Sequence, residues 1–414
     1  MTQQTAARRG PRTALILLAF IAFVALGLPD GLLGVGWPAI RAGFGLPLDA
    51  ISLYLAAVVA GYMTSSFLSG TLLARMGVGR MLAASCLLTG MALLGYTLVP
   101  QWWMMVALGV CAGLGAGAID AGLNTYVAAH FGEGLMQWLH ASWGIGVTIG
   151  PLLMTAGLAT RNSWRFGYQA VGVFQIALAA CFALTIALWT QKAPAEGESA
   201  EKRLTEYQTP MAQTLRQPAA WLSVALFFLY VGAEGALGTW TYTLLTESRG
   251  VDKTLAGFFA GSYWFTFTIG RIIAGVIAKR LGINTLVLGG LAGALLGAGL
   301  LIWNPSALAN VAAVAIIGLA IAPIFPAMMS GTRLRVGDQH AANTIGMQMT
   351  ATGFGTAVIP SLMGVLASRI SLEIIPLCLL GVYAGLFGLY LLASRQRPAL
   401  AAARATIDHA ETAG

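Results

Sequence analysis

The sequence contains twelve apolar stretches, each long enough to cross a lipid bilayer as a helix. A spanning helix needs about 20 mostly apolar residues, because the hydrocarbon core of a membrane is about 30 Å thick. Only 9% of the 414 residues are charged, whereas a soluble domain carries about 25%. The pattern predicts an all-α integral membrane protein with twelve transmembrane helices. The stretches cover residues 13–40, 48–74, 79–99, 103–130, 136–159, 166–190, 219–247, 254–278, 283–303, 307–332, 341–368 and 371–394.

A polar segment separates the first six stretches from the last six. Residues 191–218 include the run KAPAEGESAEKRLTEYQ, which is too charged to enter a membrane and too long for a tight turn. We therefore expect four parts. They are an N-terminal half of six helices (1–190), a cytoplasmic linker (191–218), a C-terminal half of six helices (219–394) and a cytoplasmic tail (395–414).

The basic residues indicate the orientation of the chain. Lys and Arg collect in the cytoplasmic loops of membrane proteins, and most of the 23 basic residues fall inside when both termini are placed in the cytoplasm. We expect a multi-pass protein of the plasma membrane, the bacterial inner membrane, with both termini cytoplasmic. This topology also accounts for the net charge of +8, so nucleic acid is not expected as a partner.

The two halves of the sequence resemble each other in three places that keep their order. The offsets between the paired segments are 204, 205 and 209 residues. Six helices per half is an even number, so both halves enter the membrane from the same side and form a parallel, pseudo-symmetric repeat. The pairs are 30–34 (DGLLG) with 234–238 (EGALG), 70–77 (GTLLARMG) with 275–282 (GVIAKRLG), and 144–154 with 353–363, which share GxG followed by PxLM.

Three acidic residues lie inside the predicted spans, namely Asp30, Asp120 and Glu234. A charged side chain at the centre of a spanning helix costs roughly 2.5–3.5 kcal/mol, so such residues usually face a polar cavity, pair with a base or carry a proton. A carboxyl group that alternates between its neutral and ionised forms can load and release a proton. The sequence therefore predicts proton coupling at Asp120 first, Asp30 second and Glu234 third. The alternative is that these acids accept hydrogen bonds that hold the bundle together.

Polar and aromatic side chains near the acids are candidates for binding a solute. Asn124 lies one helical turn after Asp120 and shares its face. The other candidates follow on the fifth, seventh and eighth spans, and a sugar would need this mixture of amides, carboxylates and aromatic faces. They are Gln137, His140, Trp143, Trp240, Tyr263 and Trp264. For His140 the alternatives are a packing contact or a place on a proton path, and for each Trp an anchor at the membrane interface.

Four arginines are expected to brace the structure or its gate. Arg75 and Arg80 flank the loop between the second and third spans, and Arg280 occupies the matching position in the C-terminal half. Arg271 lies within the eighth span, about two turns before its predicted cytoplasmic end.

The remaining reactive residues do not form a catalytic or metal-binding pattern. The spacing of the four cysteines matches no disulfide or metal-binding motif. The four histidines are scattered and show no ligand spacing such as HxxxH. We expect no metal, no cofactor and no enzymatic activity, with H⁺ as the coupling ion. A membrane receptor should carry a soluble signalling segment, and no loop here is longer than the linker.

Several motifs resemble those of the major facilitator superfamily, and within it the fucose–proton symporter family of sugar transporters. The run GTLLARMGVGR (70–80) is similar to the superfamily signature, although Ala74 replaces its usual Asp. The segments that resemble the symporter family are GLPDGLL (27–33), GAGAIDAGLNTYV (115–127), LFFLYVGAEGALGTW (226–240), SYWFTFTIGR (262–271) and GLAIAPIFPAMMS (318–330).

The resemblance implies a major facilitator fold, a sugar-type substrate and proton symport. It also implies a pair of carboxylates on the first and fourth helices, at the positions of Asp30 and Asp120, although the family often has Glu where this chain has Asp120. We therefore expect a monomeric secondary transporter that moves a small polar solute by alternating access. The alternatives are a proton-coupled exporter of drugs or metabolites and a sodium-coupled sugar symporter.

Overall fold

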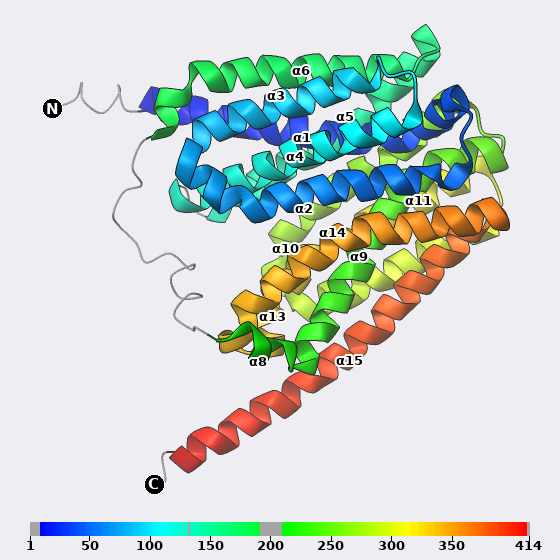
Figure 1. Cartoon of the computed structure of the whole chain (residues 1–414). Helices are drawn as coiled ribbons and strands as arrows, with labels where there is room; N and C mark the ends of the chain where they lie inside the picture. The colour runs from blue at the N-terminus through cyan, green and yellow to red at the C-terminus, as the bar shows by residue number, and fades with distance from the viewer. Residues whose placement is uncertain (1–8, 131–132, 191–208, 412–414) are drawn as a thin grey trace. The chain divides into compact units, whose positions relative to one another are not determined.

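The computed structural model describes residues 9–130, 133–190 and 209–411, and these residues are almost entirely helical (Figure 1). The long helices are α1 (Arg9–Phe44), α2 (Ile51–Met76), α3 (Val78–Tyr96), α4 (Trp102–His130), α5 (Glu133–Arg161), α6 (Arg165–Leu184), α9 (Pro218–Thr243), α10 (Lys253–Trp303), α11 (Ala307–Ile321), α14 (Asp338–Arg369) and α15 (Ile374–Glu411). The shorter elements are η1 (Leu48–Ala50), η2 (Ile186–Thr190), α8 (Met211–Leu215), η3 (Leu244–Ser248), α12 (Ile324–Ser330) and α13 (Thr332–Val336).

Within the described residues, eleven helical segments are long and apolar enough to cross a membrane. The sequence predicted twelve spans, and the one outside this set is residues 254–278. That segment is helical and forms the first part of α10, but it carries Arg271 and several hydroxyl side chains. The tenth predicted span is divided into α11 and α12 by a break at Ala322 and Pro323. The linker lies mostly outside the described residues, and its last part contains the short helix α8.

The backbone confirms the internal repeat. Gly77 ends α2 with φ 74° and ψ 161°, and Gly282 bends α10 with φ 75° and ψ 162°. The two glycines are 205 residues apart and occupy matching places in the repeated motif. A positive φ is easily adopted only by glycine, which has no Cβ atom. The same special geometry therefore ends the second helix of each half.

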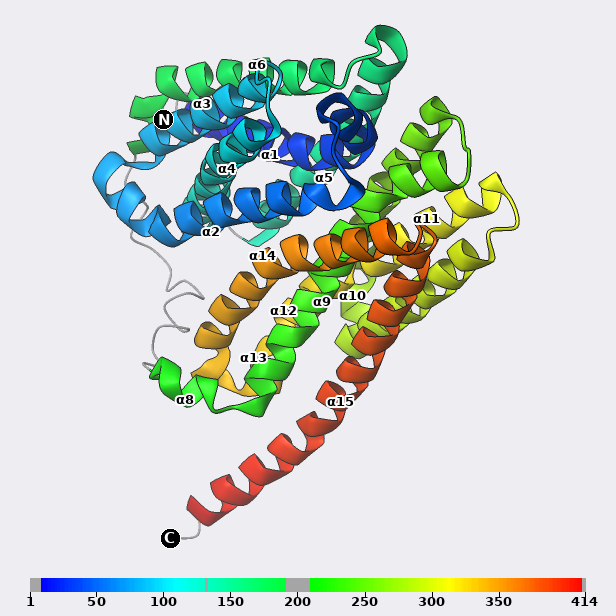
Figure 2. The same ribbon diagram turned by 45° about the vertical axis from the view of Figure 1, so that its right-hand side comes forward.

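The internal contacts of the chain define two compact units. The first comprises residues 1–196, 236–268 and 360–375, and the second comprises 197–235, 269–359 and 376–414. In the first unit, α1 packs along α5, α2 along α4, and α3 against both α4 and α6 (Figures 1 and 2). The boundaries predicted from sequence, with halves at 1–190 and 219–394, stay a prediction.

Glycine allows α1 and α5 to approach each other closely. A Cβ atom on Gly31 would lie 2.6 Å from the carbonyl oxygen of Val147, and one on Gly150 would lie 2.7 Å from that of Leu28. Real side chains do not tolerate such distances to backbone atoms, so only glycine fits. Small residues at helix contacts are typical of membrane proteins, where van der Waals packing drives helix association.

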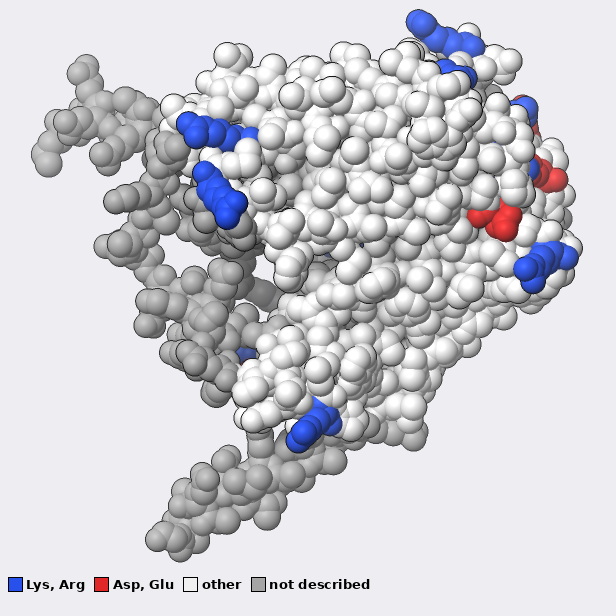
Figure 3. Space-filling view, viewed as in Figure 1, with Lys and Arg blue, Asp and Glu red and all other residues white. Residues whose placement is uncertain are grey.

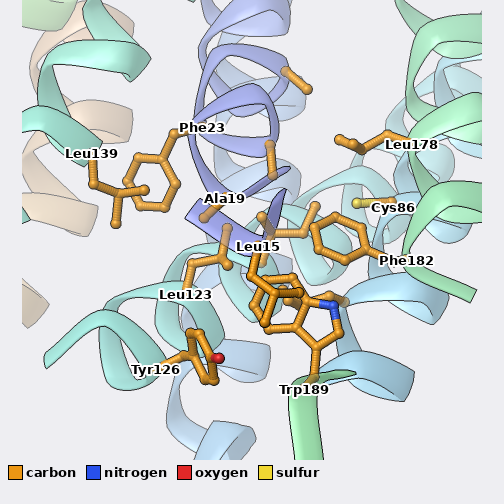
Figure 4. Packing of buried hydrophobic residues seen from close by; sticks show 14 of the residues in the cluster. Leu15, Ala19, Phe23, Cys86, Leu123, Tyr126, Leu139, Leu178, Phe182 and Trp189 are labelled. Atoms are coloured by element: carbon orange, nitrogen blue, oxygen red, sulfur yellow. The ribbon is translucent and has the colours of Figure 1, made fainter. Parts of the chain in front are cut away.

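A hydrophobic cluster packs the beginning of α1 inside the first unit (Figure 4). Leu15 and Phe23 of α1 meet Leu123 of α4 and Phe182 of α6, and all four are less than 4% exposed. Trp189 of η2 closes the cluster, with its ring 5.4 Å from that of Phe182. The cluster fixes α1 at the centre of the unit, and α1 carries Asp30 further along.

In the second unit, polar side chains hold α9 to its neighbours. Ser223 of α9 accepts a hydrogen bond of 2.6 Å from the amide of Gln348 and one of 3.2 Å from Arg335. Arg335 is only 3% exposed and also donates to the Met328 carbonyl at 2.5 Å. Because buried polar groups stabilise a fold only when they are hydrogen-bonded, this network gives α9 a defined position.

Charged side chains lie near the ends of the helices on the face shown in Figure 3, and uncharged residues cover the middle of the helices. Three ion pairs join described residues at such ends, namely Arg41 with Glu247, Arg249 with Glu373, and Arg333 with Asp338. The second is a two-pronged pair, in which Arg249 donates to Oε1 of Glu373 at 3.0 Å and to Oε2 at 2.7 Å. Ser248 donates to the same carboxylate at 2.7 Å.

We expect Glu373→Gln to lower the free energy of unfolding of the protein at neutral pH but not in acid. The hydrogen bond from Arg249 lowers the pKa of Glu373 below its ordinary value of 4.5. A carboxylate with a lowered pKa stabilises the fold above its ordinary pKa and loses this effect as the pH falls through the lowered value. Because Glu373 is partly exposed, the loss at neutral pH should be at most about 1 kcal/mol.

Thermal unfolding of the purified protein at neutral pH and in acid measures this difference. Asp49→Asn, which changes an acid in η1, just before α2, is the matched control. A difference between the wild type and Glu373→Gln that persists unchanged at about pH 3, below the ordinary carboxylate range, would contradict the assignment.

Candidate solute and proton site

Asp30 lies in the middle of α1, and its side chain is exposed even though the helix is apolar on both sides. An ionisable side chain at that depth is normally found facing water or a partner rather than lipid. One partner is Trp143 of α5, whose indole Nε1 donates to Oδ2 of Asp30 at 3.4 Å. The close packing of α1 on α5 at Gly31 and Gly150 brings the two residues together.

Asp120 of α4 receives hydrogen bonds on both of its oxygens. The hydroxyl of Tyr62 on α2 donates to Oδ2, and the amide of Asn124 donates to Oδ1 at 2.9 Å. The contact with Asn124 confirms that these two residues share a helix face. Tyr62 was not predicted from the sequence. The available signal was a group of hydroxyl residues, Tyr62 to Ser66, inside an otherwise apolar span.

The helix α5 connects the two carboxylates. His140 and Trp143 are three residues apart on α5 and therefore lie on one side of it. Trp143 bonds to Asp30, and His140 is close enough to Asp120 to interact with it electrostatically. The two carboxylates also interact with each other. His140 is exposed, and its ring meets the edge of Phe23 at a centroid distance of 5.6 Å.

Aromatic rings adjoin the acid pair. The rings of Trp143 and Trp264 meet edge to face at 5.8 Å with an interplanar angle of 88°. Behind them, Trp264 packs on Tyr263 at 4.5 Å and on Phe267 at 5.8 Å. Tyr263 is fully buried and Trp264 is 6% exposed, so Tyr263 supports Trp264 from behind. The structure thus brings Asp30, Trp143, Trp264 and Tyr263 together within the first unit.

Three predicted residues lie elsewhere or are not described. Trp240 is fully buried and donates its indole hydrogen to the Pro360 carbonyl at 2.9 Å, so its contacts are those of helix packing. Glu234 belongs to the second unit, where it interacts with Arg271. The side chain of Gln137 lies outside the described residues.

The predicted gate arginines occupy helix ends, apart from Arg271. Arg75 lies in the last turn of α2 and Arg80 at the start of α3, and both are exposed. Arg280 is exposed just before the bend at Gly282, whereas Arg271 is half-buried inside α10. In the part of the chain that the structure describes, no group of three His, Cys, Asp or Glu side chains could hold a metal ion.

The end of the first unit that carries Arg41, which we name the Arg41 end, is tightly closed. Gly34 of α1 faces the backbone of Gly238 on α9 so closely that a Cβ atom on Gly34 would contact the Gly238 carbonyl oxygen. Beyond this crossing, Arg41 pairs with Glu247 of η3. The glycine Gly257 of α10 packs in the same close manner on the side chain of Thr155. Helices from both predicted halves therefore meet at this end.

Comparisons with known proteins identify relatives that cover most of the chain. A glucose/mannose transporter of Bacillus subtilis (strain 168) is 22% identical over 362 residues, which are 84% of this chain and 86% of that protein. The human sodium-dependent glucose transporter 1 is 23% identical over 393 residues, which are 84% of this chain and 72% of that protein.

The fold and the family model agree with these relatives. The crystal structure of a bacterial homologue of the human lysosomal transporter Spinster, in an inward-facing and occupied conformation, matches with a TM-score of 0.72 at 13% identity. The match covers 93% of this chain and 97% of that one. The family model of the Major Facilitator Superfamily matches residues 15–360. The chain therefore belongs to the Major Facilitator Superfamily and is a multi-pass membrane transporter, not an enzyme.

Proposed function

We propose that this transporter moves a sugar or sugar derivative together with a proton by alternating access. The observation that carries the proposal is the cluster of Asp30, Asp120 and Trp143, which lie in membrane-spanning helices, together with Trp264 of α10. It combines groups that can hold a proton with groups that can bind a sugar. The names of the relatives from Bacillus subtilis and human, both glucose transporters, support the substrate class.

The carboxylates supply the proton step. Two ionised carboxylates near each other repel, so binding a proton at either one relieves that repulsion. Tyr62 and Asn124 both donate to Asp120, which suits a carboxylate that accepts hydrogen bonds while the proton is elsewhere. In this proposal Asp120 is the main coupling residue and Asp30 is its partner.

The aromatic and amide groups supply the solute step. A pyranose has hydroxyl groups around its edge and an apolar C–H face, and the latter packs on indole rings. Trp143 and Trp264 offer such rings next to Asp30, while Asn124 and His140 offer hydrogen-bonding groups next to Asp120. Because Trp143 also bonds to Asp30, a sugar on its ring would lie beside the coupling carboxylate.

Alternating access requires that one end of the bundle close while the other opens. The tight crossing of α1 and α9 at Gly34 and the ion pair between Arg41 and Glu247 support a closed Arg41 end. With both termini in the cytoplasm of a bacterial cell, the Arg41 end faces outward. The solute would then enter from this side when the crossing opens.

We expect sugar addition to make the medium around right-side-out proteoliposomes more alkaline. Purified protein is tested in a weakly buffered medium with D-glucose, D-mannose, D-galactose and L-fucose, with and without Na⁺. Alkalinisation by at least one sugar without Na⁺, abolished by a protonophore, is the expected result. Vesicles without protein are the control.

Other results would point to the alternative functions. Uptake that depends on Na⁺ and moves no protons would replace the proposal with sodium-coupled symport, as the name of the human relative suggests for that protein. A failure of all four sugars, combined with proton-driven export of drugs in the same vesicles, would replace it with an exporter.

A further inference from the structure

A proline inside α1 lies directly before Asp30. Pro29 has no backbone N–H, so the carbonyl of Ala25, four residues earlier, lacks the hydrogen bond that a helix normally forms there. Ala25 is fully buried, and a carbonyl without a hydrogen bond in an apolar interior is unfavourable. Proline is tolerated in spanning helices where a neighbouring helix supplies the missing donor. The turn of α1 that leads to Asp30 therefore needs a donor from elsewhere in the fold.

Gln175 of α6 supplies this donor. Its side-chain amide donates to the Ala25 carbonyl oxygen at 2.9 Å, although the two residues are 150 positions apart. A carbonyl can only accept, so the nitrogen end of the amide must face α1. Gln175 is 0% exposed, and the other buried residues of α6 are apolar or aromatic. A buried amide is unfavourable unless it is hydrogen-bonded, so the bond to Ala25 explains why an amide stands in this helix.

The same turn of α1 also contacts α5, which carries the hydrogen-bond partner of Asp30. Gly27 packs directly on the backbone carbonyl of Trp143, and the indole of Trp143 donates to Oδ2 of Asp30 at 3.4 Å. This distance is longer than usual for an N–H···O hydrogen bond. A small rotation or bend of α1 at Pro29 would thus break the bond. The donor that fixes the Pro29 turn therefore also decides whether Asp30 meets Trp143.

The internal repeat shows that the proline and the glutamine occur in the same half of the chain. By the offset of 204, Pro29 corresponds to Ala233, which has its own N–H. By the offsets of 204, 205 and 209, the counterpart of Gln175 lies within residues 379–384, where the sequence LLGVYA contains no amide side chain. The half without the proline thus also lacks the glutamine, as expected if the amide serves the carbonyl that the proline leaves unpaired.

We propose that Gln175 is a positioning residue for the candidate site. Its amide replaces the hydrogen bond that Pro29 removes from α1, and it thereby holds the following turn in the orientation that brings Asp30 to Trp143. A proline leaves a helix able to bend, and the bond from α6 selects one orientation. The inference deepens the proposed function and rests on it where transport is concerned, whereas the hydrogen bond can be tested without transport.

A thermal-stability cycle on the purified protein tests the hydrogen bond. Gln175→Leu removes the amide but keeps a side chain of similar size, while Pro29→Ala gives residue 29 an N–H that can bond to the Ala25 carbonyl. Gln175→Leu is expected to lower Tm by about 2–4 °C, as for the loss of one buried hydrogen bond. In the Pro29→Ala background this loss should largely disappear, because the carbonyl then keeps a donor.

Pro38→Ala, at the second proline of the same helix, is the matched control. Gln175→Leu should lower Tm in this background as much as in the wild type, because Pro38 leaves a different carbonyl unpaired. Equal losses in the two proline backgrounds, or no loss in any background, would overturn the inference. If Gln175→Leu alone does not fold, recovery of folded protein by Pro29→Ala but not by Pro38→Ala supports the inference, and recovery by both or by neither contradicts it.

Sugar exchange in proteoliposomes tests the positioning role. Gln175→Leu is expected to raise the KM about fivefold, as for the loss of one hydrogen bond in the site, because Asp30 and Trp143 lose their alignment. Pro29→Ala should restore the KM of this variant. A role in folding alone would lower the maximal rate and leave the KM unchanged, and that result would overturn the proposal. A wild type that exchanges none of the four sugars would refute the proposed function, while the Tm cycle would still decide on the hydrogen bond.

Discussion

Asp120→Asn is expected to abolish uptake driven by a pH gradient while sugar exchange continues. Asparagine has nearly the shape of aspartate but cannot gain or lose a proton, so a site that contains it cannot complete the coupled cycle. Exchange of internal for external sugar requires no net proton movement and should survive. We expect concentrative uptake to fall by about tenfold or more, which corresponds to at least about 1.4 kcal/mol.

The experiment measures labelled sugar in proteoliposomes under two conditions, an imposed pH gradient and equal sugar on both sides. Asp49→Asn is the control, because it removes an acid outside the cluster, in η1. Asp30→Asn should show the same pattern as Asp120→Asn to a smaller degree. If both variants keep full uptake driven by the pH gradient, then neither carboxylate couples protons to transport.

Gly34→Val is expected to stop transport by preventing closure of the Arg41 end. A Cβ atom on Gly34 would contact the carbonyl oxygen of Gly238 more closely than side chains can. That oxygen belongs to a helix backbone and cannot rotate away. Overpacking typically costs 1–3 kcal/mol, and about 2.8 kcal/mol would reduce the closed population by about 100-fold. The same substitution at Gly289, which has open space around it, is the control.

Opening of this end can be measured by thiol labelling. In a background without the four native cysteines, Thr155→Cys places a thiol beside Gly257, where the wild-type side chain is 5% exposed. A membrane-impermeant thiol reagent should label it slowly in the parent protein and much faster after Gly34→Val. Equal labelling rates together with unchanged uptake would show that the crossing of α1 and α9 does not open.

Hydrophobic length and the repeat were sufficient to predict the helical architecture from sequence. Whether residues 254–278 span the membrane was the least certain part of this prediction. Arg271 and several hydroxyl groups lower the hydropathy of this segment but do not prevent it from forming a helix. Residues 307–330 form a single candidate span, as predicted. The exact place of the break at Ala322 and Pro323 could not be predicted, because a Pro inside an apolar stretch can bend a helix or end it. The two kinds of glycine, those with positive φ and those at close contacts, cannot be distinguished from composition.

The candidate site was predictable only where its members share a helix. Asp120 and Asn124 are four residues apart, so their contact follows from helical geometry. The bonds from Tyr62 to Asp120 and from Trp143 to Asp30 join different helices. Such contacts depend on how the helices rotate about their own axes, which the apolar pattern specifies weakly when all faces are hydrophobic. The bond from Trp240 to the Pro360 carbonyl also joins different helices and could not be predicted from the depth of Trp240. Its role as a binding candidate stays a prediction.

Gly34 and Gly238 occupy matching positions of the repeat, 204 residues apart in the chain. The backbone of Gly238 leaves no room for a side chain at Gly34, whereas a Cβ atom on Gly238 would lie 2.6 Å from the ring of Trp264. The two copies therefore need glycine for different reasons, one to admit a backbone and the other to admit an aromatic ring of the candidate site.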